Sequence, residues 1–168
     1  MEPLFYRRMD SPVGPLLIGV SPAGLAVLEF DRGKTPRPPL PWRDANWVES
    51  ARHTAAWAGQ LTEYFAGKRR VFDLPLDLRG TPFQLRCWNA LLEIPYGETR
   101  TYAQIARRVG SPRGFRAVGQ ANHDNPVAIV VPCHRVLTSS GTLGGYGGGL
   151  PIKQRLLELE GALKPTLF

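Results

Sequence analysis

The chain has 168 residues, 43% of them hydrophobic, which is enough apolar material for a core and excludes an intrinsically disordered protein. Its formal net charge is +7, so nucleic acid or another anionic surface is a candidate partner, with a merely basic enzyme as the alternative. Two cysteines and three histidines, without CxxC or HxxxH spacing, argue against a structural zinc site. No apolar run approaches the roughly 20 residues that span a bilayer.

The first third of the chain has the pattern of a β-meander. Three apolar runs alternate with turns that contain Pro and Gly, at residues 4–6, 16–20 and 25–30. Residues 31–44 are rich in Pro and Arg and predict a loop. Residues 48–66 have helical spacing that stops at Gly67, and residues 71–76 predict a short strand or extended segment.

Helices replace strands in the second half of the chain. Thr81, Pro82 and Gln84 predict a helix start, with Thr as the N-cap, Pro in the first turn and Gln closing a capping box. This helix is expected to run to about Ile94, with Cys87 packed on its apolar face. A β-rich beginning followed by helices is typical of the α+β class.

Residues 101–122 have the outline of a helix-turn-helix. Thr101 and Gln104 repeat the capping box and begin a short helix that Gly110 ends, and Ser111-Pro112 begins a second helix. The second helix carries small residues, which allow close approach, and basic or amide side chains, which suit phosphates and base edges. Helix pairs of this kind are also ordinary packing units, so the pattern leaves both interpretations open.

A thiol, an imidazole and a guanidinium follow an apolar run at residues 127–131, which predicts a buried strand. Pro132 marks the end of that strand, and reactive groups often occupy such exits. Cys133 is either a small buried hydrophobe or a nucleophile whose thiol is activated by His134 and Arg135. Adjacent strand residues point to opposite faces, so a link from Cys133 to His134 is expected to run through a water molecule.

The glycine-rich sequence GTLGGYGGG at residues 141–149 precedes a last helix, which is expected from Ile152 to Glu160. By itself this sequence is equally well a flexible connector. A nucleophile beside a DNA-binding helix, however, indicates chemistry on a base, which must first be flipped out of the duplex. Arg116 could then fill the gap in the stack, and Tyr146 could pack on the extruded base.

Several motifs in order resemble the O6-alkylguanine-DNA alkyltransferases. They are VVPCHRV at 130–136 preceded by Asn125-Pro126, RAVGQAN at 116–122, GGYGG at 144–148 and RLLELEG at 155–161. The match is close over residues 80–161 and holds only in outline before them. It implies a small N-terminal β-meander/α domain, ribonuclease H-like in outline, at residues 1–79, and a helical catalytic domain with a helix-turn-helix at 80–168.

The resemblance implies a role for each matching catalytic residue. Cys133 would be the alkyl acceptor in an irreversible reaction that each molecule performs once. His134 would deprotonate Cys133 through water, and Glu160 would orient His134. Tyr102 would donate a proton or hydrogen bond to guanine N3, although its place on the apolar stripe also fits a core aromatic. Asn125 would tie the recognition helix to the active-site segment.

The resemblance also implies how DNA and the base are held. The residues expected to contact DNA are Arg116, Ala117, Gly119, Gln120, Ala121 and Asn122. Val136, Tyr146 and Gly147 would line the base pocket; some members have serine in place of Gly147, but the expected contact is a backbone N–H that glycine keeps. No cysteine precedes Cys87, so we expect no zinc of the kind that some relatives bind, and no cofactor. By its length the chain resembles the stand-alone bacterial type, and we do not expect the Cys-rich regulatory domain that other relatives carry.

The implied substrate is double-stranded DNA that carries O6-alkylguanine, and also O4-alkylthymine, bound through the minor groove. We expect a monomer in solution, without membrane contact; cooperativity on DNA is left open. The first residues lack the apolar core of a signal peptide, so the cytoplasm and the nucleoid are the expected location. Two other functions remain open: a non-catalytic damage sensor, against which Cys133 argues, and a Cys-His hydrolase, which leaves the basic charge unexplained.

Overall fold

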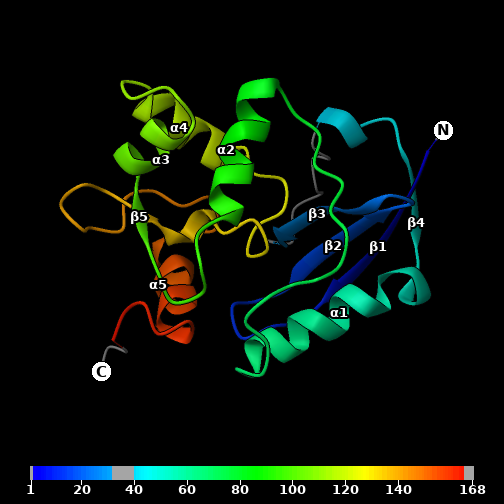
Figure 1. Ribbon diagram of the computed structural model, residues 1–168. Helices are drawn as coiled ribbons and strands as arrows, with labels where there is room; N and C mark the ends of the chain where they lie inside the picture. Colours follow the sequence, from blue (N-terminus) through cyan, green and yellow to red (C-terminus); the bar gives the residue numbers. More distant parts are fainter. Residues whose placement is uncertain (1, 32–39, 165–168) are drawn as a thin grey trace. The chain divides into compact units, whose positions relative to one another are not determined.

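The computed structural model describes residues 2–31 and 40–164 and divides into two compact units, Met1–Gly80 and Thr81–Phe168. Figure 1 shows a mixed fold, with a sheet and one long helix in the first unit and short helices in the second. The α+β class predicted from the sequence is confirmed. None of the described helices is long and apolar enough to cross a membrane.

The first unit is built on a four-stranded sheet with the order β3-β2-β1-β4. Antiparallel pairing of β1 (Pro3–Met9), β2 (Leu16–Ser21) and β3 (Gly24–Phe30) confirms the predicted meander. The strand β4 (Asn46–Glu49) pairs in parallel with β1, and the sequence pattern did not predict it. Its four residues are mostly exposed, so they carry no apolar alternation.

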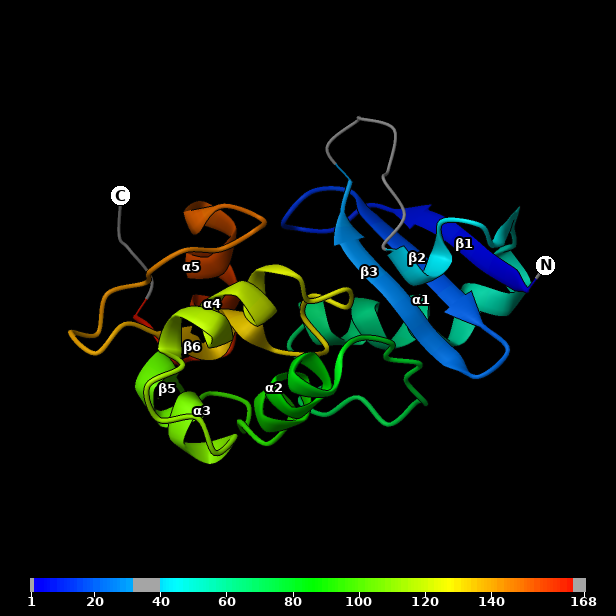
Figure 2. The ribbon, with the colours of Figure 1, turned by 90° about the horizontal axis from the view of Figure 1, so that it is seen from above.

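One helix, α1 (Ala51–Phe65), packs against β1 and β2, as Figure 2 shows. The predicted helix at 48–66 therefore begins later, because the side chain of Ser50 caps it by accepting from the backbone N–H of His53. Most of the loop predicted at 31–44 lies outside the described residues. Its end holds a 3-10 helix, η1 (Leu40–Trp42), whose Trp42 is buried with Leu4 and Val27.

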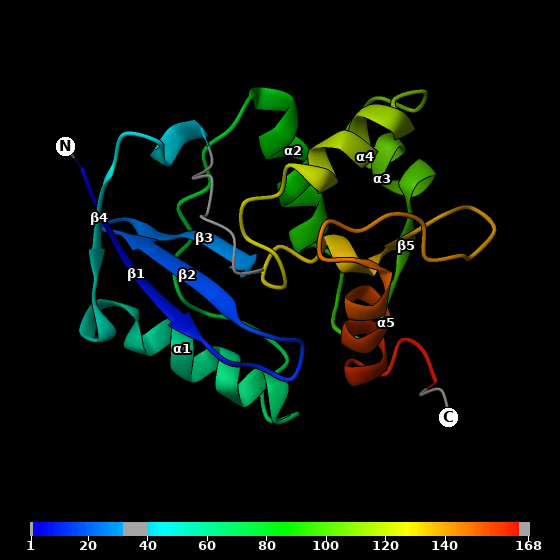
Figure 3. The same cartoon turned by 180° about the vertical axis from the view of Figure 1, so that it is seen from behind.

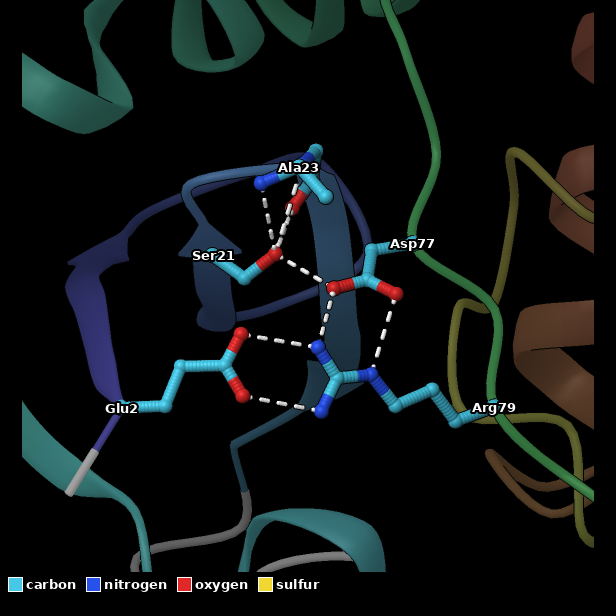
Figure 4. A network of polar contacts seen from close by, with 6 residues as sticks. Glu2, Ser21, Ala23, Asp77 and Arg79 are labelled. Carbon is cyan, nitrogen blue, oxygen red and sulfur yellow. Dashed lines mark hydrogen bonds and ion pairs between the residues drawn. The ribbon is translucent and has the colours of Figure 1, made fainter.

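The segment after α1 returns along the sheet edge, where Leu76 forms a single parallel bridge to Leu25; the rest of the predicted segment 71–76 forms no strand. Figure 4 shows the polar network that holds its end. The Arg79 guanidinium donates to both carboxylate oxygens of Glu2, at 2.8 and 2.9 Å, and to Asp77 at 3.0 and 3.1 Å. Asp77 in turn accepts from the Ser21 hydroxyl. This network ties the last residues of the first unit to Glu2, directly before β1, and to the end of β2.

The second unit contains both predicted capping boxes. Thr81 caps α2 (Pro82–Leu92) and Thr101 caps α3 (Tyr102–Arg108). Each Thr hydroxyl accepts from the backbone N–H of the Gln three residues later, and that Gln side chain accepts from the Thr backbone N–H. The next helix, α4 (Phe115–His123), packs against α3 and α2. It begins later than the sequence predicted, because Gly114 donates to Ser111 and closes a turn there.

The last part of the unit holds η2 (Cys133–Arg135), β6 (Val136–Leu137) and α5 (Leu150–Leu159), with β6 paired in parallel to β5 (Arg100–Thr101). The strand predicted at 127–131 was wrong: apart from a single bridge residue, Val127, the run forms turns. Its apolar side chains are buried, but Ile129 has φ 72°, which no strand residue adopts. The run is apolar because its consecutive residues are buried or half-buried, and burial of this kind occurs in packed turns as well as in a strand.

Candidate active site

Cys133 is the first residue of η2, directly after Pro132 and the buried turns at 127–131. Its side chain lies at the wall of a cavity of about 370 Å³, and the residue is 7% exposed. Burial raises the pKa of the thiol, while a hydrogen bond from Asn125 and the charge of Lys153 act in the opposite direction. The thiol is therefore protonated at rest, and its reaction as a thiolate requires a base.

Asn125 fixes the position of the thiol through three hydrogen bonds. Its amide nitrogen donates to the carbonyl of Val131 at 2.8 Å and to the sulfur of Cys133 at 3.2 Å. Its amide oxygen accepts from the backbone N–H of Val127 at 2.9 Å. One side chain thus holds both ends of the turn segment and the nucleophile candidate that follows it.

Glu160 lies behind η2 and binds two of its residues. Its carboxylate accepts from Nε2 of His134 at 2.8 Å and from Nε and Nη2 of Arg135 at 2.7 and 3.0 Å. Arg135 also donates to the carbonyl of Ile94 at 2.7 Å. The His134 and Glu160 side chains are fully buried. Glu160 is thus the ion-pair partner of Arg135, which the sequence did not identify.

The electrostatics of this group determine which nitrogen of His134 is basic. Burial would raise the pKa of the Glu160 carboxyl, but His134 and Arg135 outweigh it and lower this pKa to about 2. Burial lowers the pKa of His134, so its ring is neutral at pH 7. An ionised carboxylate only accepts hydrogen bonds, so the proton is on Nε2. The lone pair is then on Nδ1, which has no hydrogen-bond partner among the described residues.

The cavity beside Cys133 is walled by α4 on one side and the glycine-rich loop on another. Its lining residues are Tyr102, Gly119, Gln120, Asn122, His123, Cys133, Gly145, Tyr146 and Gly147. Tyr102 is the first residue of α3, where the Thr101 cap positions it. Burial and the neighbouring Cys133 raise the pKa of its phenol, so Tyr102 is a proton donor at neutral pH. Val136, which was expected to line the base pocket, lies fully buried in β6 and is not among these lining residues.

The predicted DNA-contacting residues of α4 divide between two faces of the helix. Arg116, Ala117 and Gln120 are exposed, whereas Ala121 is buried and its carbonyl accepts from the indole of Trp88 at 2.9 Å. Asn122 is also buried, on the cavity side, and both polar atoms of its amide lack a hydrogen-bond partner among the described residues. Asn122 lies on the buried side because one turn of helix separates it from Val118, which is in the core.

Sequence reasoning missed Lys153. Its side chain is fully buried, and its ammonium donates to the carbonyls of Val136, Leu143 and Gly145. In the sequence it resembles an ordinary helix residue. The one available signal was its position next to Ile152 and three residues before Leu156, on the apolar side of the expected helix. Within the described residues, no group of three or more acidic, His or Cys side chains is placed to hold a metal ion.

Comparison with known families gives two matches that together cover most of the chain. The model of the 6-O-methylguanine DNA methyltransferase DNA binding domain matches residues 82–162, and that of the ribonuclease-like domain matches residues 4–78. A methylated-DNA–protein-cysteine methyltransferase of Methanosarcina barkeri is 50% identical over 157 residues, covering 94% of this chain and 97% of the relative. One of Mycobacterium tuberculosis is 48% identical over 173 residues, covering 98% and 99%.

Solved structures agree with these matches. The crystal structure of Mycobacterium tuberculosis OGT in complex with DNA has a TM-score of 0.84 and 48% sequence identity, covering 94% of this chain and 93% of that one. An O6-methylguanine-DNA methyltransferase from Pyrococcus kodakaraensis has a TM-score of 0.61 at 26% identity, covering 94% and 99%. The similarity therefore extends over both units.

Proposed function

We propose a function for this chain from the premise that it belongs to the 6-O-methylguanine DNA methyltransferase family: it repairs DNA by moving the alkyl group of O6-alkylguanine onto Cys133. The observation that carries the assignment is the thiol at the wall of a base-sized cavity, directly before a histidine that a buried carboxylate orients. A hydrolase would share the Cys-His pair, but it would have no use for the exposed Arg116 on the helix beside the cavity.

The first chemical step is removal of the thiol proton. Nδ1 of His134 takes it, through a bridging water, and the resulting imidazolium is stabilised by the Glu160 carboxylate. The thiolate then attacks the alkyl carbon from the side opposite O6. A sulfur–carbon bond forms while the carbon–oxygen bond breaks, and its electron pair stays on the guanine. The thioether is stable, so one molecule accepts one alkyl group.

Loss of the alkyl group would leave guanine as an anion unless a proton arrives. Tyr102 lines the same cavity as Cys133, and its raised pKa keeps the phenol protonated until charge develops on the base. We assign it the donation to guanine N3. Asn125 holds the thiol, and Tyr146 and Gly147 form the cavity wall opposite α4. The same arrangement would accept O4-alkylthymine, which presents the same kind of alkyl carbon.

DNA binding is assigned to the exposed side of α4. Arg116, Ala117 and Gln120 face solvent, and the small side chain lets the helix approach a minor groove closely. Arg116 would occupy the space that the extruded base leaves. We propose that residues 80–168 form the domain that does this chemistry, that residues 1–79 form a separate domain, and that the protein works as a monomer on nucleoid DNA.

The assignment is tested by mass spectrometry after incubation with a duplex containing O6-methylguanine. One methyl group should appear on the peptide that contains Cys133, in a stoichiometry of one per protein molecule. The Cys133→Ala variant should still bind the duplex but leave the lesion unrepaired. Repair by that variant, or a methyl group on Cys87 in the wild-type protein, would show that the acceptor is wrongly assigned.

A further inference from the structure

We propose that Lys153 is a positioning residue, which holds the glycine-rich loop against the cavity and so sets the rate of alkyl transfer; this rests on the proposed function. Lys153 lies in the first turn and a half of α5, and Figure 3 shows the loop, in orange, leading from β6 into that helix. No part of the mechanism above uses its side chain.

The geometry of the ammonium group is that of a three-way tether. It donates to the carbonyl of Val136 at 2.7 Å, to that of Leu143, and to that of Gly145 at 3.2 Å. An ammonium has three N–H donors, and three backbone acceptors from two segments use all of them. A neutral or apolar side chain of the same length could not replace these bonds.

The two tethered segments are both parts of the site. Val136 directly follows η2, which begins with Cys133, while Gly145 lines the cavity together with Tyr146 and Gly147, and Leu143 lies two residues before Gly145. Gly144, between them, lies against Tyr102: a Cβ added there would be 3.3 Å from the ring edge of Tyr102. Lys153 therefore fixes the nucleophile segment, the loop and the phenol relative to one another.

The loop needs such a tether because of its composition. Six of the nine residues at 141–149 are glycine, which has the most backbone freedom to lose when it becomes ordered. Its ends are held by their own bonds, from Thr138 to Thr142 and from Gly149 to Tyr146. The bonds to the ammonium hold Leu143 and Gly145, which lie between the bonded residues Thr142 and Tyr146, and Gly145 lines the cavity.

Burial of a cation is costly, and this one is 0% exposed. Burial lowers the pKa of Lys153 to about 8, which still leaves its ammonium mostly protonated at pH 7. The neighbouring groups are the Cys133 thiol and the Tyr102 ring, whose centroid is 5.9 Å from the ammonium. If this position served only to pack the core, an apolar side chain would fill it equally well. Holding the three carbonyls requires the three N–H donors of the ammonium.

The test is single-turnover repair of an O6-methylguanine duplex by Lys153→Met, with Arg155→Met as the matched control. Arg155 is exposed on the same helix, so the control loses the same charge. We expect the rate at saturating DNA to fall about tenfold or more in Lys153→Met, with DNA affinity equal to that of the control. Amide hydrogen exchange should rise about tenfold in residues 141–147 and stay unchanged in α2.

Wild-type repair rates in Lys153→Met would overturn the proposal, as would a loss of DNA affinity without a loss of rate, which makes Lys153 a phosphate contact. If the variant does not fold, NMR of the wild-type lysine ammonium groups decides. We expect the ammonium hydrogens of Lys153 to exchange slowly with water. Exchange as fast as that of the exposed Lys68 would contradict the tether. Absence of methyl transfer in the wild-type protein would instead refute the proposed function, and the exchange data would still test the tether.

Discussion

At the scale of single residues, Glu160 controls the state of two neighbours at once. Its carboxylate places the proton on Nε2 of His134 and balances the buried charge of Arg135. Removing one partner of a buried ion pair costs more than the pair itself contributes, because the remaining charge stays in a medium of low dielectric constant. In the proposed mechanism, catalysis and stability therefore depend on the same carboxylate.

We predict that Glu160→Gln loses about 3–5 kcal/mol of unfolding free energy, because the Arg135 guanidinium remains buried without its counter-charge. Repair should slow as well, because an amide cannot stabilise the imidazolium. Urea unfolding and single-turnover repair measure the two effects. Glu93→Gln is the control: its pair with Arg108 is largely exposed, so the loss should stay below about 1 kcal/mol. Equal losses in both variants would contradict the account.

The pH dependence of stability follows from the same residue. The pKa of Glu160 is about 2 in the folded protein, against 4.5 for an ordinary glutamate. A lowered folded-state pKa means that its contribution is fully present above 4.5 and is lost as the pH falls toward about 2. Urea midpoints measured across this range should fall for the wild-type protein. The Glu160→Gln variant should lose less over the same range; parallel curves would refute the assignment.

The sequence suggested roles for single residues only where motifs stand together. Cys133, His134 and Glu160 were identified through a family pattern, and the structure brings the last two into contact. The partner of Arg135 could not be predicted, because it lies 25 residues away and local spacing carries no information about it. Lys153 was missed for the same reason: its three acceptors are backbone carbonyls, which have no sequence identity.

At the scale of elements, capping motifs predicted helix starts correctly, whereas an apolar run did not predict the conformation of its residues. The capping boxes at Thr81 and Thr101 depend on side chains three residues apart, so the sequence determines them directly. The supposed strand at 127–131 failed because consecutive burial is compatible with a strand or with packed turns. The bonds of Asn125 to Val127 and Val131 stabilise the turns instead, and this choice is not visible in an apolar run.

Two equivalent caps allow a matched prediction. Thr101→Ala and Thr81→Ala each remove one N-cap, so each should cost about 1 kcal/mol of unfolding free energy. Only Thr101 precedes the cavity residue Tyr102, so only Thr101→Ala should also slow methyl transfer, by several-fold at saturating DNA. Urea unfolding and single-turnover repair separate the two effects. An equal slowing in both variants would mean that general loosening, rather than the position of Tyr102, is responsible.

At the scale of the whole molecule, the net charge of +7 and the exposed arginines of the second unit favour binding to the phosphates of DNA. Lysine and arginine side chains that neutralise phosphates release counterions, so affinity falls with salt in proportion to their number. An arginine that instead enters the base stack contributes little to this salt dependence. Salt titrations can therefore distinguish two kinds of arginine on one surface.

We predict that Arg116→Gln leaves the slope of log affinity against log salt nearly unchanged, while repair at saturating DNA falls about tenfold or more because the flipped state loses its support. Arg113→Gln, in the turn before α4, is the comparison: it should reduce the slope by about 0.9, the value for one phosphate contact, and repair at saturating DNA normally. Fluorescence anisotropy between low and physiological salt measures the slopes. A reduction of about 0.9 in Arg116→Gln together with normal repair would make Arg116 one more phosphate contact, and the gap left by the extruded base would need another residue.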